Sequence, residues 1–391
     1  MNSPTVIDDV IYSYAHPHQL VKLDAVKKHG SVKAAARALG LHHSSINETI
    51  KSIKKRAALQ GYSPAHDMTH TVPQGFAVKG VSTYYGEDGK PRGQWVKSTR
   101  DQAQAEQVMR DFIESLTHDI KGKAPAVKPP AYSNADLLCV YPLGDPHFGL
   151  YAWGAETGDD FDSSIAESLT TSAINRLVDS APEAETAIVL PLGDFFHADD
   201  STARTPGSGH QLDVDTRWPK VMQIGLRALV HCVQRALSKH KKVVVRVVRG
   251  NHDHHASFGL ALALDAYFHN EKRVHVDLHP APFWYYRHGK VLIGSTHGDQ
   301  AKPADMPAIM AFDKPEDWGQ TKHRYWYLGH VHHQTQKEHP GVIVEQFRTL
   351  AARDAWHAGM GYRAGRDMCL IVHHKDHGEI ERHRCDVGML C

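Results

Sequence analysis

Apolar positions recur in two patterns along the chain, with helical spacing before residue 60 and in strand-like runs after residue 136. In the first part they fall three or four positions apart, which predicts three short helices over 18–28, 32–39 and 44–56. Residues 76–97 alternate around a glycine-containing turn and predict a β-hairpin, which would be a wing if it packed on the helices. Residues 100–120 predict one more amphipathic helix.

The second and third of these helices have the features of a helix-turn-helix. Ser31 is a suitable N-cap for the second helix, Gly40 can end it, and Ser44 or Ser45 can cap the third. The motif needs small and apolar residues where its two helices approach closely. Here these residues are Ala35, Ala36, Leu39, Leu41 and Ile46. The segment therefore resembles a helix-turn-helix with its recognition helix over 44–56, and a helical bundle used for protein contacts is the alternative.

Polar and basic side chains on the third helix are the candidate contacts to nucleic acid. Its polar residues would face base edges, and its basic residues would face phosphates. The candidates are Ser44, Ser45, Asn47, Lys51, Lys54, Lys55 and Arg56. Residues 1–130 hold 18 Lys and Arg against 12 Asp and Glu, a net charge of +6, whereas the rest of the chain has a net charge of −5. This asymmetry favours a polyanionic partner such as DNA, and a solvated lysine-rich helix face is the alternative.

The boundary between the two parts is marked by residues 121–131, which combine Pro, Gly, Ala and Lys without an apolar period. We expect an amino-terminal domain over 1–125, a linker over 126–134 and a second domain over 135–391. The five cysteines are scattered and contain no C-x-x-C pair, which favours a reducing cytosol. No apolar run is long enough to span a membrane and the start lacks a signal-peptide pattern, so the sequence predicts a cytoplasmic protein without a membrane partner.

After residue 136 a series of apolar runs each ends abruptly in Gly, Asp, Asn or His. These runs cover 137–143, 187–192, 243–248, 291–294 and 325–328. Helical stretches such as 161–180 and 217–240 lie between them. Buried strands that alternate with helices, and that have polar residues at their ends, predict an α/β fold with its site along one edge of a sheet.

The side chains that follow these strands are of the kinds that bind divalent cations. The donor side chains at these strand ends are Asp145, His147, Asp194, His197, Asn251, His252, Asp253, His297, Asp299, His330 and His332. Oxygen and imidazole donors without a thiolate favour Mn²⁺, Fe or Zn²⁺ in a catalytic site. The donors exceed one coordination sphere, which predicts two ions that share a carboxylate. The 31 histidines of the chain agree with a metal site.

The order D-x-H, G-D, G-N-H-D, H-G-D and G-H-x-H, over 136 to about 335, resembles the calcineurin-like metallophosphoesterase superfamily. The resemblance implies an αββα sandwich and two ions bridged by Asp194. In it, the first ion would be held by Asp145, His147 and His332, and the second by Asn251, His297 and His330. It also implies a bridging hydroxide that attacks phosphorus in line, with His252 near the leaving oxygen and Asp253 orienting His252.

The substrate is suggested by two further features. His197, three residues after Asp194, is similar to a residue that helps to place the scissile phosphodiester in the double-strand-break repair exonucleases of the superfamily. Together with the helix-turn-helix, this indicates a Mn²⁺-dependent DNA nuclease, with residues 202–216 as a loop at the mouth of the site. The alternatives are a small-nucleotide phosphodiesterase or phosphatase whose amino-terminal domain serves oligomerisation or regulation, and a DNA-binding regulator.

The tail after His332 limits the comparison with the repair nucleases. It shows no helix that would dock a coiled-coil ATPase, which argues against that partner. Four arginines of the tail would either line the path of DNA or be surface charges, namely Arg348, Arg353, Arg363 and Arg366. The arrangement also looks like metallophosphoesterases of phage and prophage genomes, so we expect a bacterial cell as the setting. The oligomeric state is open, and a homodimer is allowed.

Overall fold

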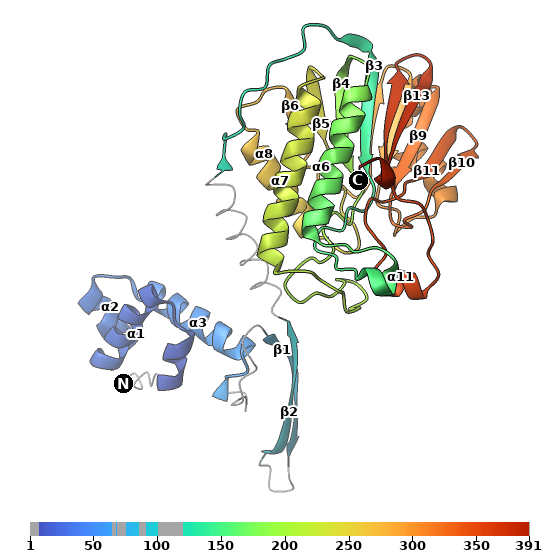
Figure 1. Ribbon diagram of the computed structural model, residues 1–391. Coiled ribbons are helices and arrows are strands. Elements are labelled where there is room, and N and C mark those ends of the chain that lie inside the picture. The colour runs from blue at the N-terminus through green and yellow to red at the C-terminus, as the bar shows by residue number, and fades with distance from the viewer. Residues whose placement is uncertain (1–7, 65–67, 69–75, 86–90, 101–119, 391) are drawn as a thin grey trace. The chain divides into compact units, whose positions relative to one another are not determined.

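The structure is a computed structural model, which describes residues 8–64, 68, 76–85, 91–100 and 120–390 (Figure 1). The chain forms two compact units, the first ending at Asp111 and the second beginning at Phe112. The helix expected over 100–120 lies, apart from its two end residues, outside the described residues. Within the described residues, no helix has the length and apolar character that crossing a membrane requires.

Helices occur in the first unit at all three predicted places. They are α1 (Pro17–His29), α2 (Val32–Leu39) and α3 (His43–Leu59), preceded by the 3-10 helix η1 (Asp9–Tyr14). Ser31 caps α2 as predicted, because its side chain accepts a hydrogen bond from the Ala34 N–H at 3.2 Å. The N-cap of α3 is His42 rather than Ser44 or Ser45, so this helix begins one residue earlier than expected.

The three helices pack on the small residues that the sequence singled out. Ala35, Ala36 and Ile46 are buried together with residues of α1. Leu41, expected in the same core, is instead 41% exposed. The predicted hairpin is also present, as the antiparallel strands β1 (Phe76–Tyr85) and β2 (Pro91–Arg100).

Two β-sheets with helices outside them make up the second unit (Figure 1). The larger sheet has the spatial order β13 (Gly378–Asp386), β12 (Asp367–His374), β3 (Asn134–Leu143), β4 (Ala184–Pro191), β5 (Lys242–Val245) and β6 (Val274–Val276). The smaller sheet has the order β10 (Thr335–His339), β11 (Val342–Gln346), β9 (His323–Leu328), β8 (Val291–Ser295) and β7 (Trp284–His288). The helices are α5 (Gly154–Thr157), α6 (Ser163–Ser180), α7 (Trp218–Leu237), α8 (Ala256–Tyr267), α9 (Met306–Asp313), α10 (Pro315–Gln320) and α11 (Ala355–Gly359), and short 3-10 turns are η3 (Pro303–Asp305) and η4 (Val387–Met389).

Alternate residues of the central strands enter different layers of this unit, because successive side chains of a strand point to opposite faces. Tyr141 of β3 is buried in one core cluster with residues of α6, α7 and α8. Its neighbour Val140 is buried between the two sheets, where Ile293 of β8 also lies. On the far side of the smaller sheet, Trp326 of β9 packs against Met310 of α9. The layers therefore follow the order helix, sheet, sheet, helix that the sequence analysis expected.

Candidate metal centre

The strands β3, β4 and β5 are parallel neighbours in one sheet, and β8 and β9 are parallel neighbours in the other. The carboxyl ends of parallel strands meet at one edge, and the predicted ligands stand in the loops directly after them. Asp145 and His147 follow β3, Asp194 follows β4, and Asn251 follows β5. From the smaller sheet, the segment after β8 supplies His297, and the segment after β9 supplies His330 and His332.

Asp145, His147 and His332 form one group of converging donor atoms. The Nε2 atoms of His147 and His332 lie 3.0 Å apart, and His332 Nε2 lies 3.8 Å from Asp145 Oδ1. Burial lowers the pKa of His147 well below its usual range and that of His332 to about 3, so both rings are neutral near pH 7. Two neutral imidazoles that direct nitrogen atoms at one point beside a buried carboxylate are suited to a divalent cation.

Asp194, His297 and His330 form a second group, and Asn251 adjoins it through His297. The Nδ1 atom of His297 faces the Leu192 carbonyl oxygen at 2.9 Å and so carries the hydrogen. Its Nε2 atom faces Asp194 Oδ2 at 3.2 Å and Asn251 Oδ1 at 3.0 Å. A ring nitrogen between two oxygen acceptors needs a cation there, either a proton or a metal ion.

The charged groups around His297 also favour a cation at this ring. Burial by itself would lower the pKa of this imidazole, but the carboxylates of Asp194 and Asp145 outweigh burial and raise it to about 10. Asp145, which is completely buried, has its pKa raised to about 7 by the loss of solvent. The first and second groups of donors are in contact at His297, because its Nδ1 lies 3.7 Å from Asp145 Oδ1. Asp194, the expected bridge, is placed by its distances in the second group.

The backbone is strained at the same positions. Among the described residues, six that are not glycine have positive φ angles, and five of these are candidate ligands. They are Asp145 (42°), His147 (48°), Asp194 (46°), His330 (74°) and His332 (56°). Residues with side chains adopt this region rarely, and such residues cluster at functional sites. The strain is therefore an independent indication that this edge of the sheets is the functional site.

Glycines next to the ligands leave space for them. A Cβ on Gly250 would lie 2.0 Å from Asp194 Oδ1, and a Cβ on Gly329 would lie 2.6 Å from Asp145 Oδ2. Any side chain at either position would displace a carboxylate of the site. The Gly-Asp and Gly-Asn patterns in the sequence therefore have a steric cause.

His252 and His197 form a third group with His147. The Nδ1 atom of His252 lies 2.8 Å from the carbonyl oxygen of His197, and its backbone N–H donates to Asp194 Oδ1 at 2.8 Å. The expectation that Asp253 orients His252 differs from what is found. The Asp253 carboxylate accepts hydrogen bonds from the N–H groups of Phe196 and Gly250, so it joins two ligand loops instead.

His197 is 1% exposed, which differs from the expectation of a substrate-handling residue. Its Nδ1 atom lies 3.2 Å from Nδ1 of His147, on the side of that ring away from His332. Its Nε2 atom is buried and has no hydrogen-bond partner among the residues that the structure describes. The geometry makes His197 a positioning residue for His147.

A pocket of about 380 Å³ opens over the candidate ligands. One part of its lining comes from the loop after β4, which the sequence placed at the mouth of the site, and includes Thr205, Ser208, His210, Gln211, Leu212 and Asp213. Another part comes from the segment around α11, which the sequence analysis missed, and includes Asp354, Trp356, His357 and Tyr362. The sole local signal for that segment is the helix start at Asp354, whose side chain accepts from the His357 N–H at 2.7 Å.

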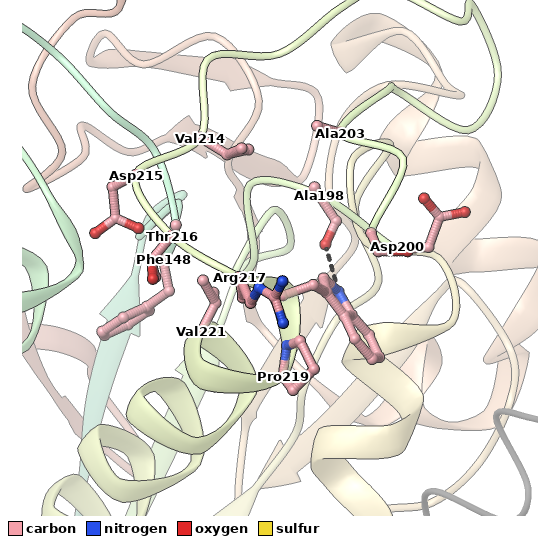
Figure 2. A pocket seen from close by; sticks show the side chains of 13 residues that line it. Phe148, Ala198, Asp200, Ala203, Val214, Asp215, Thr216, Arg217, Pro219 and Val221 are labelled. Atoms are coloured by element: carbon pink, nitrogen blue, oxygen red, sulfur yellow. Dashed lines mark hydrogen bonds between the residues drawn. The ribbon is translucent and has the colours of Figure 1, made fainter.

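A second pocket, of about 710 Å³, lies beside the start of α7 (Figure 2). The Trp218 side chain borders it and donates from Nε1 to the Ala198 carbonyl oxygen at 3.1 Å. Within the described part of the chain, none of the residues lining this pocket belongs to the three His and Asp groups. We therefore place the chemistry in the smaller pocket.

The four tail arginines make hydrogen bonds within the second unit. Arg348 donates to a carboxylate, and the other three donate to backbone carbonyl oxygens. Their acceptors include, in order, Asp367, Tyr362, Tyr362 and Leu350. These contacts hold the segment between β11 and β12 in place.

In the amino-terminal unit, the candidate nucleic-acid contacts divide into two sets. The side chains of Ser44, Asn47, Lys51, Lys54 and Lys55 are exposed. Ser45 is half-buried, and its hydroxyl accepts from Lys22 Nζ at 3.0 Å. Arg56, expected to face phosphate, donates from Nε to the Tyr14 carbonyl oxygen at 2.9 Å and also to Gln19, because η1 and α1 pack against this end of α3.

No family profile and no curated protein matches the chain. Among solved structures, it is similar to a conserved uncharacterized protein and predicted phosphoesterase of Streptococcus pneumoniae TIGR4, at 11% identity and a TM-score of 0.26, over 64% of this chain and 98% of that one. It is similar to zinc-bound Vps29 of Entamoeba histolytica at 14% identity and a TM-score of 0.27, over 64% and 99% of the two chains. A phosphopantetheinyl hydrolase of Mycobacterium tuberculosis matches at 12% identity and a TM-score of 0.26, over 59% and 94%. Values this low do not establish an activity, so the functional conclusion rests on the side chains of the site.

Proposed function

We propose that this chain is a metal-dependent phosphodiester hydrolase of the calcineurin-like type that acts on nucleic acid, with DNA as the expected substrate. The observation that carries the proposal is the convergence of two groups of His and Asp donors, most of them on strained backbone, next to a pocket that Asp194, His330 and His332 line. Bound divalent ions would activate water and neutralise charge on phosphoryl oxygens. The donors fit Mn²⁺, and they also fit Fe or Zn²⁺.

His252 is the residue best placed to handle a proton at the leaving oxygen. It lines the pocket, and its Nδ1–H donates to the carbonyl oxygen of His197. That contact fixes the ring and leaves Nε2 as the nitrogen that can hold or release a proton. His197 orients His147. The Asp253 carboxylate joins its own loop to the loop that contains Asp194.

Support for nucleic acid as the substrate comes from α3. Ser44, Asn47, Lys51 and Lys54 are three or four positions apart, so they share one face of this helix, and all four are exposed. A polar helix start followed by lysines on one face is suited to contacting a phosphate backbone. In this proposal the amino-terminal unit holds the nucleic acid while the second unit cleaves it.

A second candidate function is hydrolysis of a small nucleotide, with the amino-terminal unit in a regulatory or oligomerisation role. The observation in its favour is the pocket over the ligands, because about 380 Å³ falls within the range of small-molecule sites. Both candidates use the same metal ligands and the same chemistry. They differ in whether α3 contributes to turnover.

The test is hydrolysis by the full chain with Mn²⁺ of end-labelled single- and double-stranded DNA and, in parallel, of the p-nitrophenyl ester of thymidine 5′-phosphate. Asp194→Asn and the triple variant Lys51→Ala, Lys54→Ala, Lys55→Ala are compared with the wild type. We expect Asp194→Asn to lose both activities and the triple variant to lose mainly activity on DNA. Turnover of the ester with intact DNA would favour the small nucleotide, and failure of both reactions would overturn the proposal.

A further inference from the structure

The segment around α11 is fixed to the metal centre by side-chain contacts. The His357 ring stacks on the His332 ring with centroids 4.8 Å apart and an angle of 23° between the planes. Asp354 is buried and accepts from both the backbone N–H and Nδ1 of His357, each at 2.7 Å. The segment therefore keeps a defined place beside a candidate ligand.

Three rings of this segment form an aromatic wall, made of Trp356, His357 and Tyr362. The Trp356 ring lies 4.9 Å from the His357 ring at 88° and 5.9 Å from the Tyr362 ring at 38°. Arg353 and Arg363 both donate to the carbonyl oxygen of Tyr362, at 3.2 and 2.7 Å. These two bonds hold the backbone of the wall at Tyr362 and do not use atoms of its rings.

Trp356 is 59% exposed although it lines the pocket over the metal ligands. A ring this exposed buries only part of its apolar surface in the fold, and its position in a concave site makes the remaining surface suited to a ligand. The loop residues Thr205, Ser208 and His210 line the same pocket with polar groups. A phosphodiester at the metal ligands would therefore have an aromatic surface and a polar surface for the group that it carries.

We propose that Trp356, supported by His357 and Tyr362, stacks a nucleobase next to the scissile phosphate. This inference rests on the proposed function and deepens it, because it assigns a residue of the pocket to the base beside the scissile phosphate. Stacking suits this role since every base has a π-face, so the wall accepts different bases without reading their sequence.

The first experiment compares two esters with the same leaving group, the p-nitrophenyl ester of thymidine 5′-phosphate and p-nitrophenyl methyl phosphate. The ratio of their kcat/KM values measures the contribution of the nucleoside. We expect Trp356→Ala to lower this ratio about tenfold, mainly through KM for the nucleoside ester, and Trp356→Phe to retain most of it. Trp153→Ala is the matched control, since Trp153 is 57% exposed and is not part of the pocket lining.

A ratio that stays the same in Trp356→Ala would overturn the inference, even where both rates fall together. The second experiment measures binding of a fluorescent dinucleotide to the full chain without added metal. We expect Trp356→Ala to weaken this binding about tenfold and Trp153→Ala to leave it unchanged. If wild type hydrolyses neither ester but binds the dinucleotide through Trp356, the proposed hydrolase fails and the base platform stands. Equal binding by wild type and Trp356→Ala, or no binding by either, would overturn the platform.

Discussion

The Nδ1 atoms of His197 and His147 lie 3.2 Å apart, although the two residues are 50 positions apart in the chain. This contact leaves Nε2 of His147 as the nitrogen that faces His332. Partners of this kind fix the orientation and the tautomer of a metal-binding imidazole. His197 therefore acts on the candidate metal site through its contact with His147.

We expect His197→Ala to weaken Mn²⁺ binding by about 10- to 100-fold, as loss of a ligand's orienting partner does. Isothermal titration of the metal-free protein measures this directly. Because the defect lies in metal affinity, excess Mn²⁺ should restore most of the activity. A variant that binds Mn²⁺ normally but remains inactive would instead show that His197 handles the substrate.

Replacement of His252 should affect catalysis more than metal binding. We expect His252→Ala to lower kcat by about 10²- to 10⁴-fold for a DNA or alkyl leaving group, because it removes proton transfer to the leaving oxygen. The loss should be much smaller for a p-nitrophenolate leaving group, which needs no proton. Rates for the two kinds of ester, measured side by side, check the role, and an equal loss for both would contradict it.

Bound metal should stabilise the fold, because the donors converge only in the folded chain. At a Mn²⁺ concentration of about 100 times its Kd, we expect the free energy of unfolding to rise by about 2.7 kcal/mol. Asp194→Asn should lose most of this increase. His333→Ala, a change at an exposed histidine outside the three His and Asp groups, is the control and should retain the increase. Denaturant unfolding with and without Mn²⁺ provides the comparison.

His240 should make the fold sensitive to acid. Its Nε2 lies 2.9 Å from the Tyr141 hydroxyl and its Nδ1 lies 2.8 Å from the Ala184 carbonyl oxygen, and burial lowers its pKa from 6.5 to about 4. The unfolded chain therefore takes up this proton near pH 6.5, and the folded chain does so only near pH 4. Stability should be complete above pH 6.5 and should fall as the pH drops to about 4, by on the order of 3 kcal/mol. Urea unfolding across this range should show a shallower pH dependence for His240→Gln, and equal slopes would contradict the assignment.

The lysines and the arginine of α3 should behave differently when replaced. We expect the triple variant of Lys51, Lys54 and Lys55 to Ala to reduce the slope of log K for DNA against log salt by roughly 2 to 3. Arg56→Ala should instead destabilise the amino-terminal unit by about 1–2 kcal/mol, because it removes the hydrogen bonds to Tyr14 and Gln19. DNA binding at several salt concentrations and thermal unfolding separate the two effects.

The positions of the donor side chains could be predicted from the sequence because they lie in the segments that follow buried strands, and the carboxyl ends of parallel strands share an edge. The choice of seven ligands among these donors came from the resemblance to the metallophosphoesterases. The direction in which a side chain points was harder to predict than its position along the chain. Asp253 is adjacent to His252 in the chain, yet its carboxylate points to the N–H groups of Phe196 and Gly250. Likewise, periodicity placed Arg56 on the polar face of its helix, but the packing of η1 there depends on contacts between distant residues.

The aromatic wall had no comparable signal in the sequence. Trp356 and His357 belong to a helix of five residues, too short to show a period, and its place beside His332 depends on the strands on either side. The contact between His197 and His147 is also long-range. The roles of residues that support a site through such long-range contacts can therefore be recognised only in the folded chain.

The positive φ angles at five candidate ligands have a consequence for the metal-free protein. Each such residue holds its backbone in a conformation that costs on the order of 1 kcal/mol or more, and the cost falls on the loops rather than on the sheets. Chelation should therefore loosen these loops first, with faster amide hydrogen exchange and easier proteolysis at the strand ends while the strands stay protected. Bound ions would then hold the strained loops in place. Loss of the metal would open these loops locally before the domain as a whole unfolds.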